Sequence, residues 1–264
     1  MKSRWGHRPL WWWRRSYAVL VLVAAAACTT TAHAQDPEAL FDVAVGAYQR
    51  GRFDSAAVGF TRLAQGGIDD ARVWYDLGNA HFKSGHIGAA LVSYRRGLRL
   101  APRDADLRAN YGYVRLFAAD KIDPVGVFFL ERWWQSLMDR LSLAEAQFLA
   151  ALSFWLAALL TAWRLWPGRI RRVGLGLVVV AWILWVGATG ASATCYLRDV
   201  LNRRGAVVAV KTDVRGGPGA DYALQFVAHD GLLGIVERSE SGWYLVRFPN
   251  GLKGWIAASD FEAM

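Results

Sequence analysis

The residues that could do chemistry are few, and their spacing assembles no catalytic or metal-binding set. His81 and His86 lie five residues apart, and no carboxylate or cysteine completes a set of zinc ligands around them. His229 stands alone, and Cys195 lies in a long apolar stretch with no histidine near it to act as a base. The glycine cluster 215–219 lacks the lysine and hydroxyl residue of a phosphate-binding loop. We therefore expect no enzymatic activity, no metal and no cofactor.

The charge of the chain reports on topology more than on partners. The formal net charge is +9 over 264 residues, which by itself would suit nucleic-acid binding. The first 34 residues carry five of these positive charges and the stretch 164–172 carries four, with no acidic residue in either. The remainder holds 22 basic and 22 acidic residues, so we expect no nucleic-acid partner.

Two long apolar stretches, 143–166 and 173–197, flank the short basic loop 167–172. Twenty helical residues span roughly 30 Å, which is the thickness of a bilayer core. The pattern predicts a transmembrane helical hairpin whose arginine-rich loop faces the cytoplasm. Two buried helices of a soluble core are the alternative, although the second stretch has 25 residues without a charge.

The first 34 residues have the pattern of a secretory signal peptide. A basic segment precedes the apolar run 17–28, and Ala32-His33-Ala34 fits a cleavage site. Retention as an anchor and lipidation at Cys28 are the alternatives. Because the hairpin crosses the membrane twice, the sequence predicts a bacterial inner-membrane protein with two spans and both folded modules on the periplasmic side.

Between residues 35 and 118 the sequence repeats itself with a period of 34 residues. The matched pairs are Leu40 and Trp74, Val43 and Leu77, Ala44 and Gly78, Gly51 and Gly85, Phe53 and Ile87, Ala56 and Ala90, and Phe60 and Tyr94. The order of large, small and turn residues resembles the tetratricopeptide repeat (TPR). The second unit runs from Ala71 to Asp104, and a third, partial unit begins at Ala105.

The resemblance implies a surface that binds peptides or partner helices, lined by the first helix of each unit. Helical phase places seven residues on it: Phe41, Val45, Tyr48, Tyr75, Asn79, Phe82 and Lys83. Packing between the repeats is the alternative for each of them.

The stretch 119–142 leads from the repeat to the first apolar helix. Asp123-Pro124 ends the preceding helix. Phe129, Trp133, Leu137 and Leu141 then recur every four residues, which indicates either an amphipathic helix in the membrane interface or a core helix packed on the repeats. In the second apolar stretch, Gly187, Gly190 and Ala191 are small enough for close packing of the two apolar helices, or of a helix from another protein.

Residues 205–264 have short strand-like runs separated by turns, which favours a small closed all-β barrel. The expected strands are 206–210, 234–237, 243–247 and 254–256. The runs VRGGPGADY and SGWYLVRFPNGLKGWI resemble bacterial SH3 domains. The resemblance implies binding of peptidoglycan peptides or protein segments, with Tyr222, Trp243 and Trp255 as candidate groove residues. Packing in the core is the alternative for the two tryptophans.

The whole order of modules resembles the BatE-type proteins of the bacterial aerotolerance operon. The expected fold is a multi-domain membrane protein with an α-helical TPR domain, a two-helix transmembrane hairpin and a small SH3-like barrel. The resemblance implies a non-enzymatic scaffold for protein–protein interaction in an aerotolerance or envelope-stress complex. Its partners would be other inner-membrane proteins, including von Willebrand A-domain proteins. A peptidoglycan-binding tether or sensor is the alternative function.

Overall fold

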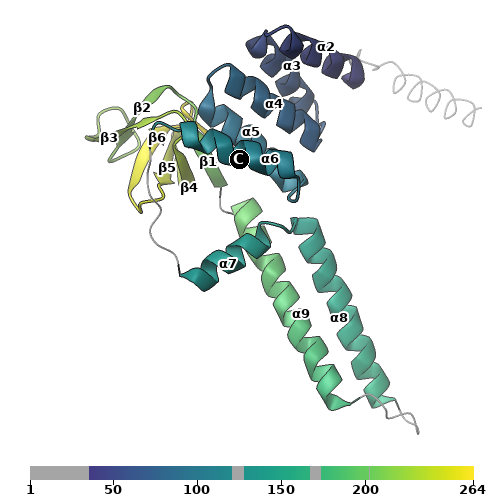
Figure 1. Ribbon diagram of the computed structural model, residues 1–264. Helices are drawn as coiled ribbons and strands as arrows, with labels where there is room; N and C mark the ends of the chain where they lie inside the picture. The colour runs from purple at the N-terminus through teal and green to yellow at the C-terminus, as the bar shows by residue number, and fades with distance from the viewer. Residues whose placement is uncertain (1–35, 121–127, 167–173, 202) are drawn as a thin grey trace, which may run out of the picture. The chain divides into compact units, whose positions relative to one another are not determined.

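The computed structural model describes residues 36–120, 128–166, 174–201 and 203–264 (Figure 1). The predicted signal peptide, the Asp123-Pro124 helix break and the basic loop 167–172 lie outside the described residues. From Phe41 to Met264 the described chain forms one compact unit.

The N-terminal part consists of paired helices. They are α2 (Pro37–Gln49), α3 (Phe53–Gln65), α4 (Ala71–Lys83), α5 (Ile87–Leu100) and α6 (Ala105–Val114), followed by the 3-10 turn η1 (Arg115–Phe117). The turns between paired helices need glycine, because Gly51 and Gly85 have φ angles of +74° and +85°. Asp70 and Asp104 cap α4 and α6 by accepting backbone N–H bonds.

Small residues allow the paired helices to approach closely. A Cβ atom on Gly78 would lie 2.6 Å from the Tyr94 ring, and one on Gly59 would lie 2.8 Å from the Ala44 methyl group. Tyr94 and Phe60 are almost completely buried as a result.

The repeat position of Val43 is exposed, although the equivalent position in the second unit is buried. The side chain of Val43 is 65% exposed, and that of Leu77 is 4% exposed. In the described chain α2 is the first helix, so no earlier described helix covers Val43.

Helix α7 (Phe129–Met138) presents an apolar surface with little cover. Phe129 is 70% exposed and Trp133 is 59% exposed, and of the helix's residues Met138 alone is buried. Leu141, which was expected on the same helical face, follows the end of the helix. In the described chain this segment is therefore not a core helix packed on the repeats.

Helices α8 (Leu143–Leu165) and α9 (Leu175–Tyr196) lie side by side and are long and apolar enough, by length and composition, to cross a membrane (Figure 1). The Trp182 indole donates a hydrogen bond of 3.0 Å to the Thr161 hydroxyl across the pair. A Cβ on Gly187 or Gly190 would meet nothing within 4 Å, so these two glycines do not pack against α8, whereas Ala191 packs against a cluster that contains Ala146 of α8. Packing of the two glycines against a helix of another protein stays a prediction. Helix α9 continues as one π-helical stretch, η2 (Leu197–Leu201).

The C-terminal part is an antiparallel sheet with the strand order β3-β2-β6-β5-β4-β1-β7. The strands are β1 (Arg203–Val207), β2 (Lys211–Arg215), β3 (Leu224–His229), β4 (Leu233–Glu240), β5 (Trp243–Arg247), β6 (Lys253–Ala257) and β7 (Phe261–Ala263). Its core contains Val207, Val214, Val246, Ile256 and Phe261. The expected strand 206–210 is wrong beyond Val207, because the backbone of Val208 instead bonds to Asp260 and Val210 is 82% exposed.

Candidate functional site

Asn79 is the polar centre of the predicted TPR surface. Its side-chain oxygen accepts a hydrogen bond of 2.7 Å from the Tyr94 hydroxyl and one of 3.0 Å from the Asn110 amide. Burial raises the pKa of the Tyr94 phenol well above its usual range, so the hydroxyl stays protonated and remains a donor. Asn79 thus joins α4 to both α5 and α6, which makes its first role structural.

Next to Asn79, an aromatic group continues the surface onto the third unit. The rings of Phe82, Tyr113 and Phe117 lie edge to face, with centroids between 5.0 and 5.8 Å apart. Tyr113 is 54% exposed and Phe117 is 49% exposed. Sequence reasoning missed Tyr113 and Phe117, although the 34-residue offset from Asn79 and Lys83 points to them.

On the other side of Asn79 the surface reaches the first unit. Burial raises the pKa of the Tyr48 phenol, and the neighbouring Asp76 and Tyr75 raise it further. Burial also raises the pKa of the Asp76 carboxyl, an effect that the Asn79 side chain opposes. Tyr75 therefore lies near enough to Tyr48 to affect its pKa, and a binding role for the two rings stays a prediction. We define the inner face as the following residues: Tyr48, Tyr75, Asn79, Phe82, Tyr113 and Phe117.

The other three predicted residues of this surface contribute less to it. Phe41 packs edge-on against Phe60 of α3, with the ring centroids 5.6 Å apart, so it fills space within the first unit. Val45 is half-buried. Lys83 is exposed at the end of α4 and has no ion pair with an acidic residue among those described.

His81 occupies a position that is normally aromatic in such repeats. Its Nδ1 atom is buried and finds no hydrogen-bond partner among the described residues. Burial lowers the pKa of His81 to about 4, and repulsion from His86 contributes to this shift. Among the described residues no group of three His, Cys, Asp or Glu side chains could hold a metal ion. The lowered pKa leaves His81 neutral near pH 7.

In the sheet, the candidate aromatics lie on the face opposite the core. Trp255 pairs directly with Leu245 and Arg215, and Trp243 lies two residues from Leu245, so these side chains share one face. Val246 and Ile256 point to the other face, into the core. Trp255 is 8% exposed and yet lies outside that core. Trp243 is half-buried.

Tyr222 lies in a loop that is fixed to the same face. The Arg215 guanidinium donates to the backbone carbonyls of Ala220 and Tyr222 at 2.7 and 2.9 Å. The Tyr222 ring lies against Gly217 and is 51% exposed. The structure therefore brings the three predicted residues Tyr222, Trp243 and Trp255 to one face of the sheet.

The repeat and the sheet are joined by specific polar contacts, which the sequence did not indicate. The Asp230 carboxylate accepts hydrogen bonds of 2.8 Å from the backbone N–H groups of Ile87 and Gly88, at the start of α5. Burial raises the pKa of the Asp230 carboxyl, and these two donors oppose the rise. Arg96 of α5 pairs with Glu262 at 2.8 Å. These contacts join the repeat and the sheet within one compact unit.

Comparison with known families assigns one part of the chain. The sequence pattern described as the tetratricopeptide repeat matches residues 71–104, which comprise α4 and α5. Residues 71–104 are a TPR unit. The match confirms the second predicted unit with its predicted limits, and TPR units indicate protein–protein interaction. A comparison with curated proteins finds no match.

Proposed function

We propose that this protein is a non-enzymatic scaffold of the bacterial inner membrane, whose TPR inner face holds a segment of another membrane protein. The observation that carries this proposal is the inner face itself. The half-exposed rings of Tyr113 and Phe117, in α6 and η1, stand beside Phe82 of the TPR unit 71–104. Exposed aromatic rings with fixed geometry favour the binding of apolar side chains from a partner.

The membrane location is supported by α7, α8 and α9 together. The two long helices leave most of their apolar side chains exposed, which a core helix of a soluble protein does not do. Exposed Phe129 and Trp133 on α7 suit the interface region of a bilayer. The arginine-rich loop 167–172 and the leader favour a topology with both folded modules in the periplasm. An SH3-like architecture is our proposal for the antiparallel sheet.

The resemblance to BatE-type proteins suggests the setting. A scaffold of this kind would act in an aerotolerance or envelope-stress complex and would bind von Willebrand A-domain membrane proteins. Because Asp230 caps a TPR helix, deletion of residues 205–264 would also disturb the repeat. Single substitutions on the inner face therefore test the scaffold function better than removal of a module.

The test is site-specific photo-crosslinking in native membranes. A photoreactive phenylalanine at Tyr113 or Phe82 should give a discrete crosslinked product with an inner-membrane protein, identified by mass spectrometry. Val58 on α3, which is 53% exposed and lies outside the inner face, provides the matched control position. Equal products from all three positions, or none from Tyr113 and Phe82, would rule out the inner face as the docking site.

The topology has its own test. Alkaline phosphatase fused after Met264 should be active, and the same enzyme fused within the loop 167–172 should be inactive. Activity in the loop would reverse the proposed orientation.

Binding of peptidoglycan through the sheet is a second candidate function. It is favoured by the exposed Tyr222, which stands at the edge of the face that carries Trp243 and Trp255. In a pull-down with purified sacculi, the full chain should bind, and Tyr222→Ala should weaken the binding. Leu252→Ala, at a residue that is 54% exposed, is the control. A full chain that leaves the sacculi unbound eliminates this function.

A further inference from the structure

A cavity of about 390 Å³ lies where the TPR helices α5 and α6 meet α7 and the stretch η2. Its walls combine residues that are far apart in the sequence. Six arginines line it: Arg95, Arg99, Arg108, Arg132, Arg140 and Arg198. The acidic residues in the wall are Asp139 and Asp199, so the lining has a formal net charge of +4.

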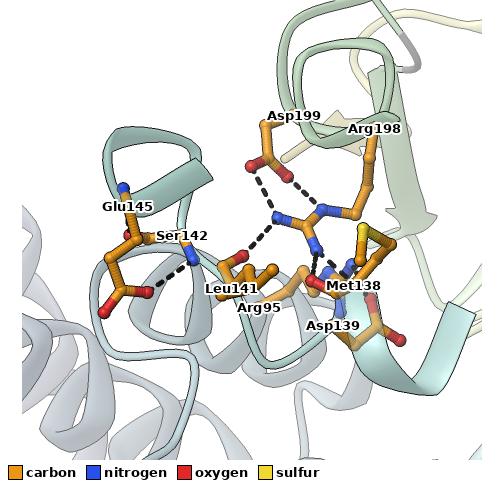
Figure 2. A network of polar contacts seen from close by, with 8 residues as sticks. All are labelled: Arg95, Met138, Asp139, Leu141, Ser142, Glu145, Arg198 and Asp199. Carbon is orange, nitrogen blue, oxygen red and sulfur yellow. Dashed lines mark hydrogen bonds and ion pairs between the residues drawn. The ribbon is translucent and has the colours of Figure 1, made fainter. Parts of the chain in front are cut away.

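The two acidic residues are already occupied by arginines of the same wall. Figure 2 shows the Arg198 guanidinium between Asp199 and the turn that follows α7. Arg198 pairs with Asp199 at 2.7 Å and donates to the carbonyl oxygens of Met138 and Leu141 at 2.6 and 3.1 Å. The side chains of Arg198 and Asp199 are 12% and 9% exposed. Asp139 is shared between Arg198 at 3.5 Å and Arg95 at 3.8 Å.

Four arginines of the wall remain without an acidic partner among the described residues. They are Arg99, Arg108, Arg132 and Arg140. Guanidinium groups that converge on one cavity favour an anion that accepts several hydrogen bonds at once, and phosphate is such an anion. The buried Arg198–Asp199 pair holds one wall in place, which preorganises the cavity for its ligand.

The position of the cavity indicates where the phosphate comes from. Arg140 precedes the start of α8 by three residues, and Arg198 follows the end of α9 by two. In the proposed topology, on which this inference rests, these are the helix ends at the membrane surface, where lipid phosphates lie. The exposed Phe129 and Trp133 of α7 give the adjoining acyl chains an apolar surface.

We propose that this cavity binds the phosphate group of an anionic phospholipid. The headgroup phosphate accepts hydrogen bonds from Arg108 on the TPR side and Arg132 on the α7 side. The bound lipid thereby links the TPR module to the membrane surface. It also sets the distance between the inner face and that surface.

The test measures lipid binding to the full chain in a neutral detergent by native mass spectrometry. We expect phosphatidylglycerol to bind at least about tenfold more tightly than phosphatidylcholine. The variant Arg108→Gln/Arg132→Gln should lose this preference. Arg62→Gln/Arg238→Gln is the matched control, because it removes the same charge at exposed residues outside the cavity. Circular dichroism confirms that both variants fold.

Three results would overturn the inference. The first is an unchanged preference in Arg108→Gln/Arg132→Gln, and the second is an equal loss in the control variant. The third is displacement of the lipid by millimolar inorganic phosphate beyond the effect of sodium chloride at equal ionic strength, since the ligand would then be free phosphate.

An alkaline carbonate wash of membranes distinguishes failure of the proposed membrane location from failure of the proposed cavity ligand. A chain released from membranes refutes the membrane location, whereas a chain that is retained without lipid preference refutes the cavity ligand alone.

Discussion

Replacing His81 with phenylalanine should remove a specific acid sensitivity of the TPR module. The buried Nδ1 atom of His81 has no hydrogen-bond partner among the described residues, and burial lowers the pKa of this residue from 6.5 to about 4. The folded state therefore binds a proton at His81 less readily than the unfolded state does. Stability from this residue is complete above pH 6.5 and is lost as the pH falls through about 4.

The size of the effect follows from the shift. A pKa difference of about 2.5 units corresponds to about 3 kcal/mol, or roughly two orders of magnitude in the opening equilibrium. His81→Phe cannot bind a proton and should not show this loss. It also replaces an unpaired polar atom by apolar surface, which favours the variant at every pH.

The assay is hydrogen exchange measured by mass spectrometry on peptides from α4 and α5, corrected for the intrinsic pH dependence of exchange. Between pH 7 and pH 4 the wild type should lose about 3 kcal/mol more protection than His81→Phe. His86→Gln is the control and should keep most of the difference, because burial is the main cause of the shift.

NMR of histidine side chains checks the mechanism directly. The sequence has five histidines, so comparison with His81→Phe assigns the His81 resonance. A midpoint near 6.5 for His81, or parallel loss of protection in wild type and variant, would refute the reasoning.

Three further predictions concern close packing and two long-range hydrogen bonds, and two of them include a control substitution. Gly78→Ala should destabilise the TPR unit by about 1–3 kcal/mol despite the better helix propensity of alanine, because its Cβ would lie 2.6 Å from the Tyr94 ring. Gly112→Ala, with nothing within 4 Å, should be neutral or stabilising in the same exchange assay, and equal effects would contradict the packing argument. Asp230→Ala should cost about 1–2 kcal/mol and raise the exchange of the Ile87 and Gly88 amides, whereas unchanged exchange would show that the cap is dispensable. Trp182→Phe removes the hydrogen bond to Thr161 and should weaken the association of α8 with α9 by about 0.6 kcal/mol. The measurement is the dissociation of a split hairpin in detergent, and Trp155→Phe, at an exposed residue, is the control.

Local patterns in the sequence determined much of this protein. The 34-residue period placed the TPR unit at 71–104. This was possible because the size of each repeated residue is set by packing inside one pair of neighbouring helices. Apolar length alone predicted two helices capable of crossing a membrane, because that property depends on composition along a single segment.

Tertiary structure decided what depends on residues far apart in the chain. Asp230 caps a helix that begins 143 residues earlier in the chain, and no local sequence pattern predicts such a contact. The sequence left Trp255 open between core and groove. Strand register places it on the face opposite Val246 and Ile256, because one residue of shift moves a side chain to the other face, and its role in a groove stays a prediction. The arginine cavity is likewise visible only in three dimensions, because its walls come from four separate segments. In the sequence the arginines of the cavity form no single cluster, and basic and acidic residues are equal in number outside the leader and the stretch 164–172.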